Sequence, residues 1–245
     1  MQTQLQERLG AMLTKDVHII WDIDGTLLDT NGVGVNPFEE SLGEITGKKI
    51  KLERSKYSGF TDFEILEDLI LSVGLSELTH SQYLDFKSLY NQRLRVALDN
   101  IPAKANKGAS DFLSFTEHCK WIHNFIGTGN LFECGLHKVE SARLIQYFNP
   151  ERTYFCDFIH KSRLSIISWA SQNIPKNQVI IGDSPRDIAV AHELKIPIIA
   201  VATGQHTFEE LSSLKPYSTL SKGYTADLLI NIIQNFGMSG SEVDQ

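Results

Sequence analysis

The sequence predicts an α/β fold: a doubly wound, mostly parallel sheet with an all-helical segment inserted after the first strand. Two observations lead to this. Short apolar runs typical of buried strands alternate with stretches of helical periodicity from about residue 109 onward. Before that alternation, residues 33–100 show only helical spacing. We therefore expect a core domain formed by residues 1–32 and 101–245, and a helical subdomain over 33–100.

The first strand is expected at residues 17–21, a run rich in β-branched and aromatic side chains. Asp22 and Asp24 follow where this strand should end, and Gly25 then allows a sharp turn. Residues two apart in an extended chain point to the same side, so both carboxylates can face one site. Acidic side chains held so close persist where a cation neutralises them or where one keeps a proton. Taken alone, the same residues also suit an ordinary turn.

Three helices are expected in the inserted segment. The first ends at Gly47, and the second begins at Thr61, which has the capping-box spacing to Glu64. The third covers about residues 81–98. A linker at 100–108, which contains a proline and a glycine, should return the chain to the core.

Strands and helices then alternate to about residue 201. Strands are expected at 121–126, 154–156, 179–181 and 197–201, with helices at 131–147 and 163–172 between them. Asp22, Thr128 and Asp183 all lie at the carboxyl ends of expected strands. Because sites in parallel sheets form beyond these ends, the three residues should converge on one site.

Two strings in the chain resemble signatures of the haloacid-dehalogenase-like (HAD) hydrolase superfamily. The first is Asp-x-Asp-Gly-Thr-Leu-Leu-Asp-Thr, starting at Asp22, and the second is Ile-Ile-Gly-Asp-Ser-Pro-Arg-Asp-Ile-Ala-Val-Ala, starting at Ile180. By themselves, Asp183 and Asp187 could simply cap a helix. The resemblance covers about residues 17–230 and is to the helical-cap, phosphoglycolate-phosphatase-like subgroup. It implies a Rossmann-like core carrying a helical cap.

The resemblance implies a site for Mg²⁺, which prefers hard oxygen ligands. The side chains of Asp22 and Asp183 and the backbone carbonyl of Asp24 would be the metal ligands. Asp187 would orient a water on the metal. Thr128 would be the Ser or Thr of the second signature. It begins the triplet Thr-Gly-Asn, followed by Gly129.

The Thr-Gly-Asn triplet resembles the version found in phosphoglycolate-phosphatase-like members. The Thr128 hydroxyl and the amides of Gly129 and Asn130 could hold phosphoryl oxygens, although most Thr-Gly pairs only form turns. A third signature is a lone basic residue. Lys161 and Arg163 are both candidates.

We favour Lys161, which lies at the usual spacing ahead of Ala170. Arg163 matches a variant in which the basic residue stands closer to that alanine. The proline that commonly follows the lysine is replaced by Ser162. The basic residue that is not used should be a solvated charge at the start of the helix.

A loop in the inserted segment resembles the specificity loop of helical caps. Ser58, Gly59, Phe60 and Thr61 are therefore expected to contact substrate, and a plain loop with a capping box is the alternative. The stretch from Ser58 to Asp62 carries no basic residue.

The resemblance implies an enzyme: a Mg²⁺-dependent phosphatase acting on a small phosphorylated metabolite such as phosphoglycolate. Asp22 would attack phosphorus to form an aspartyl-phosphate. Asp24, kept protonated by its acidic neighbours, would act as general acid and then as base. Asp24 disfavours a dehalogenase, which needs no general acid. The alternatives are a phosphomutase, which the lack of a basic cap loop disfavours, and a non-enzymatic ligand-binding relative.

Composition limits the partners and the location. The chain of 245 residues has a formal net charge of −7 and no basic block, so nucleic acid and anionic membranes are not expected partners. We find no apolar run long enough to span a bilayer and no signal pattern. Three widely spaced cysteines suggest buried thiols and a cytoplasmic location. Apolar residues between Leu5 and Leu13 suggest a short helix, and the oligomeric state is left open.

Overall fold

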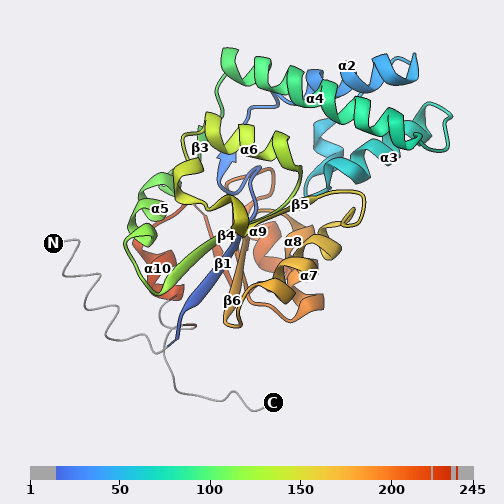
Figure 1. Cartoon of the computed structure of the whole chain (residues 1–245). Coiled ribbons are helices and arrows are strands. Elements are labelled where there is room, and N and C mark those ends of the chain that lie inside the picture. Colours follow the sequence, from blue (N-terminus) through green and yellow to red (C-terminus); the bar gives the residue numbers. More distant parts are fainter. Residues whose placement is uncertain (1–14, 222, 233–235, 237–245) are drawn as a thin grey trace.

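The computed structural model describes residues 15–221, 223–232 and 236. The short helix expected between Leu5 and Leu13 lies outside the described residues. A six-stranded sheet of order β5-β4-β1-β6-β7-β8 forms the centre of the molecule (Figure 1). Its strands, in chain order, are β1 Val17–Trp21, β4 Ile122–Leu131, β5 Thr153–Cys156, β6 Gln178–Gly182, β7 Ile198–Val201 and β8 Ser218–Leu220.

Every pairing in this sheet is parallel. Helices connect the strands, and Figure 1 shows α5 and α10 on one face of the sheet and α7 and α8 on the other. The helices of this part are α5 Ala109–Glu117, α6 Phe132–Ser141, α7 Arg163–Asn173, α8 Pro185–Leu194, α9 Phe208–Ser213 and α10 Ala226–Ile232. The predicted doubly wound α/β fold is therefore confirmed.

Strand β1 occupies the middle of the sheet, and its register places the site. Trp21, its last residue, pairs with Ile126 of β4 and with Ile181 of β6. The residues that follow Trp21, Ile126 and Ile181 therefore lie together at one edge of the sheet. Figure 1 shows the inserted helices α2, α3 and α4 beyond that edge.

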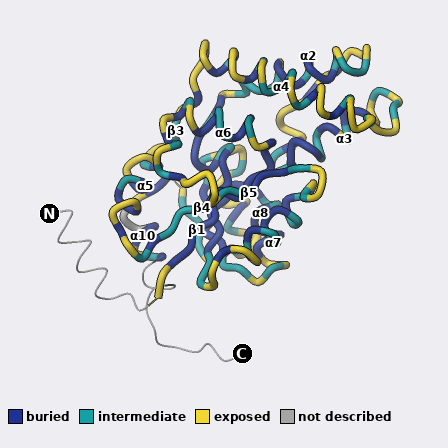
Figure 2. Tube along the Cα trace, viewed as in Figure 1, coloured by how far each residue is buried: buried dark blue, intermediate teal, exposed yellow. Residues whose placement is uncertain are grey.

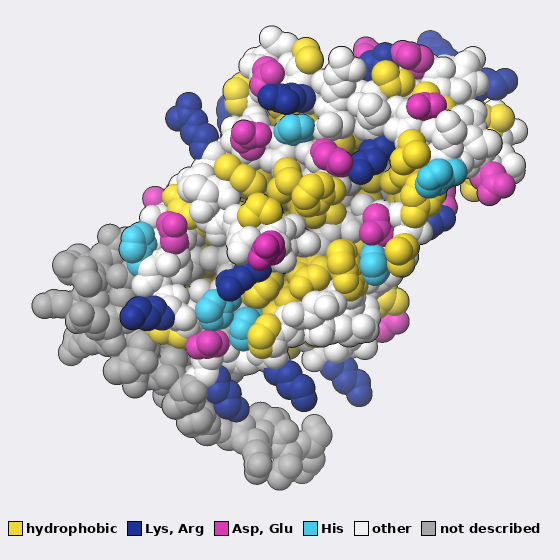
Figure 3. Space-filling model, in the orientation of Figure 1, with side chains coloured by type: hydrophobic (Ala, Val, Ile, Leu, Met, Phe, Trp, Pro, Cys, Tyr) yellow, Lys and Arg dark blue, Asp and Glu magenta, His cyan; other side chains and the backbone are white. Residues whose placement is uncertain are grey.

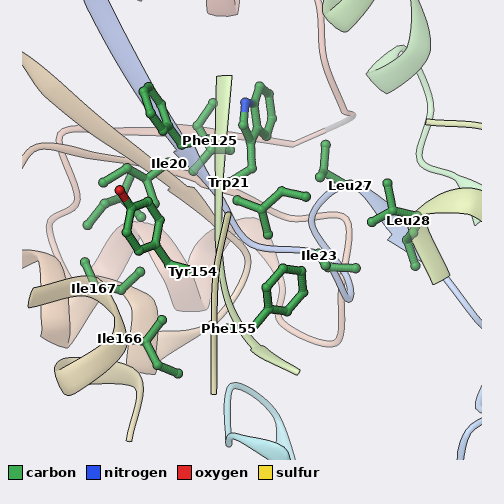
Figure 4. Close-up of a cluster of buried hydrophobic side chains, with 14 of the residues drawn as sticks. Ile20, Trp21, Ile23, Leu27, Leu28, Phe125, Tyr154, Phe155, Ile166 and Ile167 are labelled. Carbon is green, nitrogen blue, oxygen red and sulfur yellow. The ribbon is translucent and has the colours of Figure 1, made fainter. Parts of the chain in front are cut away.

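The core packs against both faces of β1, because side chains of a strand alternate between the two faces. Ile20 lies in one cluster with Ile166 and Ile167 of α7 (Figure 4). The indole of Trp21 packs edge-on against Phe112, with ring centroids 5.7 Å apart. Figure 2 shows the buried residues concentrated in the central strands. The near-continuous burial of β1 explains why its sequence is apolar throughout rather than alternating.

The inserted segment is helical, and a short two-stranded ribbon frames it. Strands β2 Leu28–Asp29 and β3 Lys104–Ala105 pair antiparallel where the chain leaves and rejoins the core. Between them lie α2 Val35–Thr46, the 3₁₀ helix Arg54–Tyr57, α3 Asp62–Ser72 and α4 His80–Asn100. The ribbon was not predicted, since two residues are too few to show a strand pattern. The division into two domains at residues 32 and 100 stays a prediction.

The expected helix boundaries hold where capping chemistry is strong. Thr61 and Glu64 form the predicted capping box of α3, and Gly47 ends α2 in the left-handed conformation. The helix expected at 131–147 was too long: α6 ends at Ser141, and Arg143 then adopts a positive φ of 58°. Strand β4 was expected to stop at residue 126. Instead it continues to Leu131, with an irregular register against β5 between Gly127 and Leu131.

Cys119, Cys134 and Cys156 are free and buried, as predicted. Among the described residues, the search for a helix long and apolar enough to cross a membrane finds none.

Candidate active site

Three buried aspartates meet beyond the carboxyl ends of β1 and β6. Asp22 follows β1, Asp183 follows β6, and Asp187 lies in the first turn of α8. A carboxylate oxygen from each lies within 4.8 Å of the others. We call these three residues the acidic cluster. Their hard oxygen atoms form the donor set that Mg²⁺ prefers, so the residues present fit this ion.

Helix capping positions Asp187, and a side-chain hydrogen bond positions Asp183. Asp187 accepts hydrogen bonds from the backbone N of Ser184 (3.1 Å) and from its hydroxyl (2.6 Å), which completes a capping box. The hydroxyl of Thr26 donates to Asp183 Oδ1 at 2.9 Å. Capping and clustering are therefore not alternatives here, because the capping residue Asp187 is also part of the cluster.

Gly25 makes room for Asp183. It has a φ of +79°, and a Cβ at this position would lie 2.3 Å from Asp183 Oδ2. A side chain would therefore both strain the backbone and displace the carboxylate. This explains in physical terms why glycine follows the two aspartates of the first motif.

Arg163, the first residue of α7, pairs with the acidic cluster. Its Nη1 lies 2.7 Å from Asp22 Oδ1 and 3.3 Å from Asp187 Oδ1, and its Nη2 lies 3.3 Å from Asp22 Oδ2. Although burial opposes its charge, Asp187 and Asp22 raise the pKa of Arg163. Its buried Nε has no hydrogen-bond partner among the described residues, which leaves one donor free.

The acidic cluster carries more negative charge than Arg163 neutralises. Burial, followed by repulsion from Asp187 and Asp22, raises the pKa of Asp183 well above its usual range. Burial also raises the pKa of Asp22, against the opposing effect of Arg163. Three carboxylates against one guanidinium leave room for a divalent cation.

The structure brings Arg163, rather than the favoured Lys161, to the acidic cluster. The Lys161 side chain is 45% exposed, and its Nζ lies 3.4 Å from Glu67 Oε1. The same Nζ lies over the ring of Phe63, 4.3 Å from its centroid. Lys161 precedes α7 and turns toward α3 of the inserted segment, whereas Arg163 begins α7 and reaches the carboxyl ends of the strands.

Asp24 turns away from the acidic cluster toward a buried lysine. Its Oδ2 accepts hydrogen bonds from Lys138 Nζ at 2.7 Å and from Asn130 Nδ2 at 2.8 Å. Burial alone would raise the pKa of Asp24, but Lys138 and Asn130 outweigh burial and lower it. The expectation that acidic neighbours keep Asp24 protonated is therefore wrong for this state, because its closest charged neighbour is a cation.

Lys138, which comes from α6, was not identified in the sequence. Its Nζ also donates to Asn130 Oδ1. Although burial opposes its charge, Asp24 and Asp62 raise the pKa of Lys138. A lone lysine within a helical stretch gives no signal of burial. Only the three-dimensional packing of α6 beneath α4 brings it to the site.

Strand β4 supplies the Thr-Gly-Asn triplet. Thr128 is fully buried, and its hydroxyl accepts a hydrogen bond from Asn130 Nδ2 at 2.9 Å. Gly129 and Asn130 line the cavity described below, whereas Thr128 binds the side chain of Asn130. The amide of Asn130 thus joins Thr128 to Asp24.

A cavity of about 220 Å³ separates the acidic cluster from the inserted helices. Its core side includes Asp22, Asp24, Gly129, Asn130, Lys138, Arg163 and Asp183. Its other side includes Val35, Phe38, Leu52, Arg54, Tyr57, Ser58, Gly59, Phe60, Ile65 and Tyr90. On the face seen in Figure 3, hydrophobic side chains gather between the inserted helices and the core.

The loop at 58–61 lies across this cavity and contacts the core. Ser58, Gly59 and Phe60 line the cavity, as expected for a substrate loop. Thr61 does not: its hydroxyl donates to the carbonyl of Lys161 at 2.5 Å and accepts from the N of Glu64. Capping and the contact with the core occupy the Thr61 hydroxyl, so its contact with substrate stays a prediction.

An arginine of α8 contacts both the loop and the first turn of α3. The Arg186 guanidinium lies over the ring of Phe60, 3.4 Å from its centroid, and its Nη1 lies 3.1 Å from Glu64 Oε1. A Cβ at Gly59, where φ is +72°, would lie 2.4 Å from the hydroxyl of Ser184. The inserted segment therefore rests directly on the motif that carries Asp183 and Asp187.

Comparisons with known proteins agree with this geometry. The family model for haloacid dehalogenase-like hydrolases matches residues 19–201. No curated protein matches the chain. Solved structures match over most of both chains.

A hydrolase from Pseudomonas syringae aligns with a TM-score of 0.67 at 19% identity, covering 90% of this chain and 99% of that one. A predicted phosphatase from Clostridium acetobutylicum aligns with a TM-score of 0.66 at 19% identity and the same coverage. A predicted phosphoglycolate phosphatase from Haemophilus somnus 129pt aligns with a TM-score of 0.64 at 16% identity, covering 89% and 98%.

At these identities the solved structures establish the fold, and the family model, which spans both aspartate motifs, establishes the family. The chain belongs to the haloacid dehalogenase-like hydrolases.

Proposed function

We propose that the protein is a Mg²⁺-dependent phosphatase that hydrolyses a small phosphorylated metabolite through an aspartyl-phosphate on Asp22. The observation that carries this proposal is the buried acidic cluster with Arg163 at the floor of the cavity. The carboxylates of Asp22 and Asp183 and the backbone carbonyl of Asp24 would hold the ion, with Asp187 beside them. When bound, Mg²⁺ would neutralise the nucleophile and the phosphoryl oxygens and so lower the barrier to attack.

Asp22 is the proposed nucleophile. Its carboxylate oxygen forms a bond to phosphorus while the bond from phosphorus to the alcohol oxygen breaks. Arg163, already within 2.7 Å of Asp22, is placed to bind a phosphoryl oxygen with its remaining donors. The amides of Gly129 and Asn130 would add further donors, with Thr128 fixing the Asn130 side chain.

Asp24 is the proposed acid and base. It donates a proton to the departing alcohol oxygen and later takes one from the water that attacks the aspartyl-phosphate. Paired with Lys138, Asp24 is in the basic form that the second step needs. Entry of a phosphoryl dianion beside Asp24 would favour its protonation and so prepare it for the first step.

The inserted helices would act as a cap that excludes bulk water from this chemistry. Contacts of the 58–61 loop with Ser184 and Arg186 support this role. The free, buried thiols suit a reducing compartment, and we propose the cytoplasm.

The test separates the two aspartates of the first motif. Asp22→Asn should abolish turnover of every phosphomonoester, because an amide cannot form the acyl phosphate. Asp24→Asn should lower the turnover rate about 10²–10⁴-fold for alkyl phosphates. The loss should be smaller for an activated aryl phosphate, whose leaving group needs no protonation. Intact mass should reveal a phosphoenzyme in Asp24→Asn after mixing with the aryl phosphate.

Chelation should stop turnover by the wild-type protein, and Mg²⁺ should restore it. Phosphate on any residue other than Asp22, or full activity in excess chelator, would refute the proposal.

A further inference from the structure

The cavity wall that faces the acidic cluster contains a group of apolar and aromatic side chains. Val35 and Phe38 of α2, Leu52, Phe60, Ile65 of α3 and Tyr90 of α4 contribute to it. Tyr57 presents its ring edge-on to Phe60, at 5.5 Å between centroids. Its hydroxyl donates to Asp68 Oδ2 at 2.5 Å, and Asp68 does not line the cavity. The polar end of Tyr57 is thus bonded to a residue outside the cavity lining.

Among the described residues, the three cationic side chains that line the cavity are each already paired. Arg163 binds Asp22, and Lys138 binds Asp24, each at 2.7 Å. The third, Arg54, lies 3.0 Å from Asp29. The carboxylate in each of these pairs also lines the cavity. A second anionic group on a substrate would have to share one of these cations with the carboxylate that already binds it.

The charge of the lining also disfavours a second anion. Five carboxylates face three cations: the acids are Asp22, Asp24, Asp29, Asp62 and Asp183, and the bases are Arg54, Lys138 and Arg163. The ion of the proposed function would balance this excess, and the phosphoryl group of the substrate then adds negative charge again. A carboxylate on the leaving group would enter a partly buried site that offers it no cation of its own, which is costly.

We propose that the leaving group of the substrate is an uncharged alcohol with an apolar body rather than a hydroxy acid such as glycolate. This inference rests on the proposed phosphatase function and names its substrate class. The phosphoryl group would lie at Asp22, and the apolar body would lie against Phe60, Ile65 and Phe38. A cavity of about 220 Å³ suits a small molecule.

The test compares benzyl phosphate with para-carboxybenzyl phosphate in the presence of Mg²⁺. The methylene group insulates the ester oxygen from the carboxylate, so the two esters have leaving groups of similar basicity. We expect kcat/KM to favour benzyl phosphate by at least about tenfold, since the carboxylate gains no cation of its own. Ethyl phosphate against phosphoglycolate repeats the comparison without the ring. The corresponding phosphonates, which are not hydrolysed, should show the same order of Kd.

Two variants test the physical cause. Asp29→Asn removes the partner of Arg54 and so frees a cation in the cavity. It should raise the kcat/KM of para-carboxybenzyl phosphate relative to benzyl phosphate by about tenfold. Glu44→Gln is the matched control, because Glu44 pairs with Arg93 and neither residue lines the cavity. This control should keep the wild-type ratio.

A third variant tests the contact of the substrate with the apolar side chains. Phe60→Ala should lower kcat/KM for benzyl phosphate more than for ethyl phosphate, which has little surface to lose. Equal or faster turnover of the carboxylated ester, or tighter binding of its phosphonate, would overturn the inference and leave the phosphatase proposal intact. Failure to release phosphate from all four esters, together with no phosphoenzyme on Asp22, would overturn both proposals.

Discussion

Arg163 is the cation on which the acidic cluster depends. It contacts both Asp22 and Asp187, and all three side chains are nearly inaccessible to solvent. Removing one partner of such a buried group leaves charges without compensation, which commonly costs about 3–5 kcal/mol. Arg163 therefore contributes to stability as well as to the proposed binding of phosphate.

Replacing the two candidate basic residues in parallel tests this assignment. Arg163→Met should lower kcat by about 10²–10³-fold, as for other lost donors to a reacting oxyanion. Lys161→Met should change kcat only a few-fold, since Lys161 contacts Glu67 and Phe63 rather than the cluster. Steady-state rates, measured below the melting temperature of both variants, provide the comparison. A larger loss in Lys161→Met would contradict the assignment.

Asp22, Asp24 and Asp183 could be predicted from the sequence, because strand ends and the spacing of a motif determine where they lie. The choice between Lys161 and Arg163 could not, since both flank the start of α7 and only side-chain direction separates them. Lys138 was missed for a similar reason. Its partner Asp24 is 114 residues away along the chain, and no local pattern records such a contact.

Helix α3 attaches the inserted segment to the core through its first turn. Asp62 Oδ2 accepts a hydrogen bond from the N of Leu131 at 2.8 Å. Burial, only partly offset by Lys138 and this hydrogen bond, raises the pKa of Asp62 to about 6. Because the pKa is higher in the folded state than in the unfolded chain, Asp62 favours folding at low pH. That contribution is complete below about pH 4 and is lost as the pH rises through about 6.

Asp62→Asn should therefore change the pH dependence of stability. The amide oxygen can still accept the hydrogen bond from Leu131, but it carries no charge. Relative to the wild type, the variant should gain up to about 3 kcal/mol of unfolding free energy between pH 4 and pH 8, measured by urea denaturation.

Asp68 on the same helix is the control. Hydrogen bonds from Lys56 and Tyr57 lower its pKa, so Asp68→Asn should give a pH trend of opposite sign. A difference between wild type and Asp62→Asn that does not vary with pH would refute this account of Asp62.

Elements with strong local signals were predicted well. The capping box at Thr61 and the apolar run of β1 are such signals, and both elements formed as expected. The short strands β2, β3 and β8 were not predicted. Each has two or three residues and is defined by its pairing partner rather than by its own pattern. Strand β4 exceeded its predicted end because Thr128–Asn130 are extended by an irregular pairing with β5.

At the scale of the whole molecule, repulsion between the buried carboxylates of the acidic cluster opposes folding. The acidic cluster is buried between β1, β6 and α8, and burial raises the pKa values of Asp22 and Asp183. A ligand that binds only the folded state stabilises it by mass action, by about 2.7 kcal/mol at a concentration one hundred times Kd. For a chain of this size, that corresponds to roughly 5–10 °C in Tm.

We therefore expect Mg²⁺ to raise the Tm of the wild-type protein in a concentration-dependent manner. Asp183→Asn should have a higher Tm than the wild type without metal, because one buried charge is gone and its amide oxygen can still accept from Thr26. The same variant should lose most of the response to Mg²⁺. Glu44→Gln, which removes a carboxylate far from the cluster, should respond like the wild type. Absence of any Mg²⁺ response in the wild type would refute the metal site.

The central position of β1 has a consequence for how the protein is made. His18 of β1 pairs with His123 on one side and with Gln178 on the other. During synthesis from the N-terminus, the apolar strand Val17–Trp21 emerges long before either neighbour and has no place to pack. The half-made chain carries Asp22 but not yet Asp183, so the acidic cluster cannot form. The nascent protein thus passes through a stage at which this sheet-forming segment lacks both of its neighbouring strands.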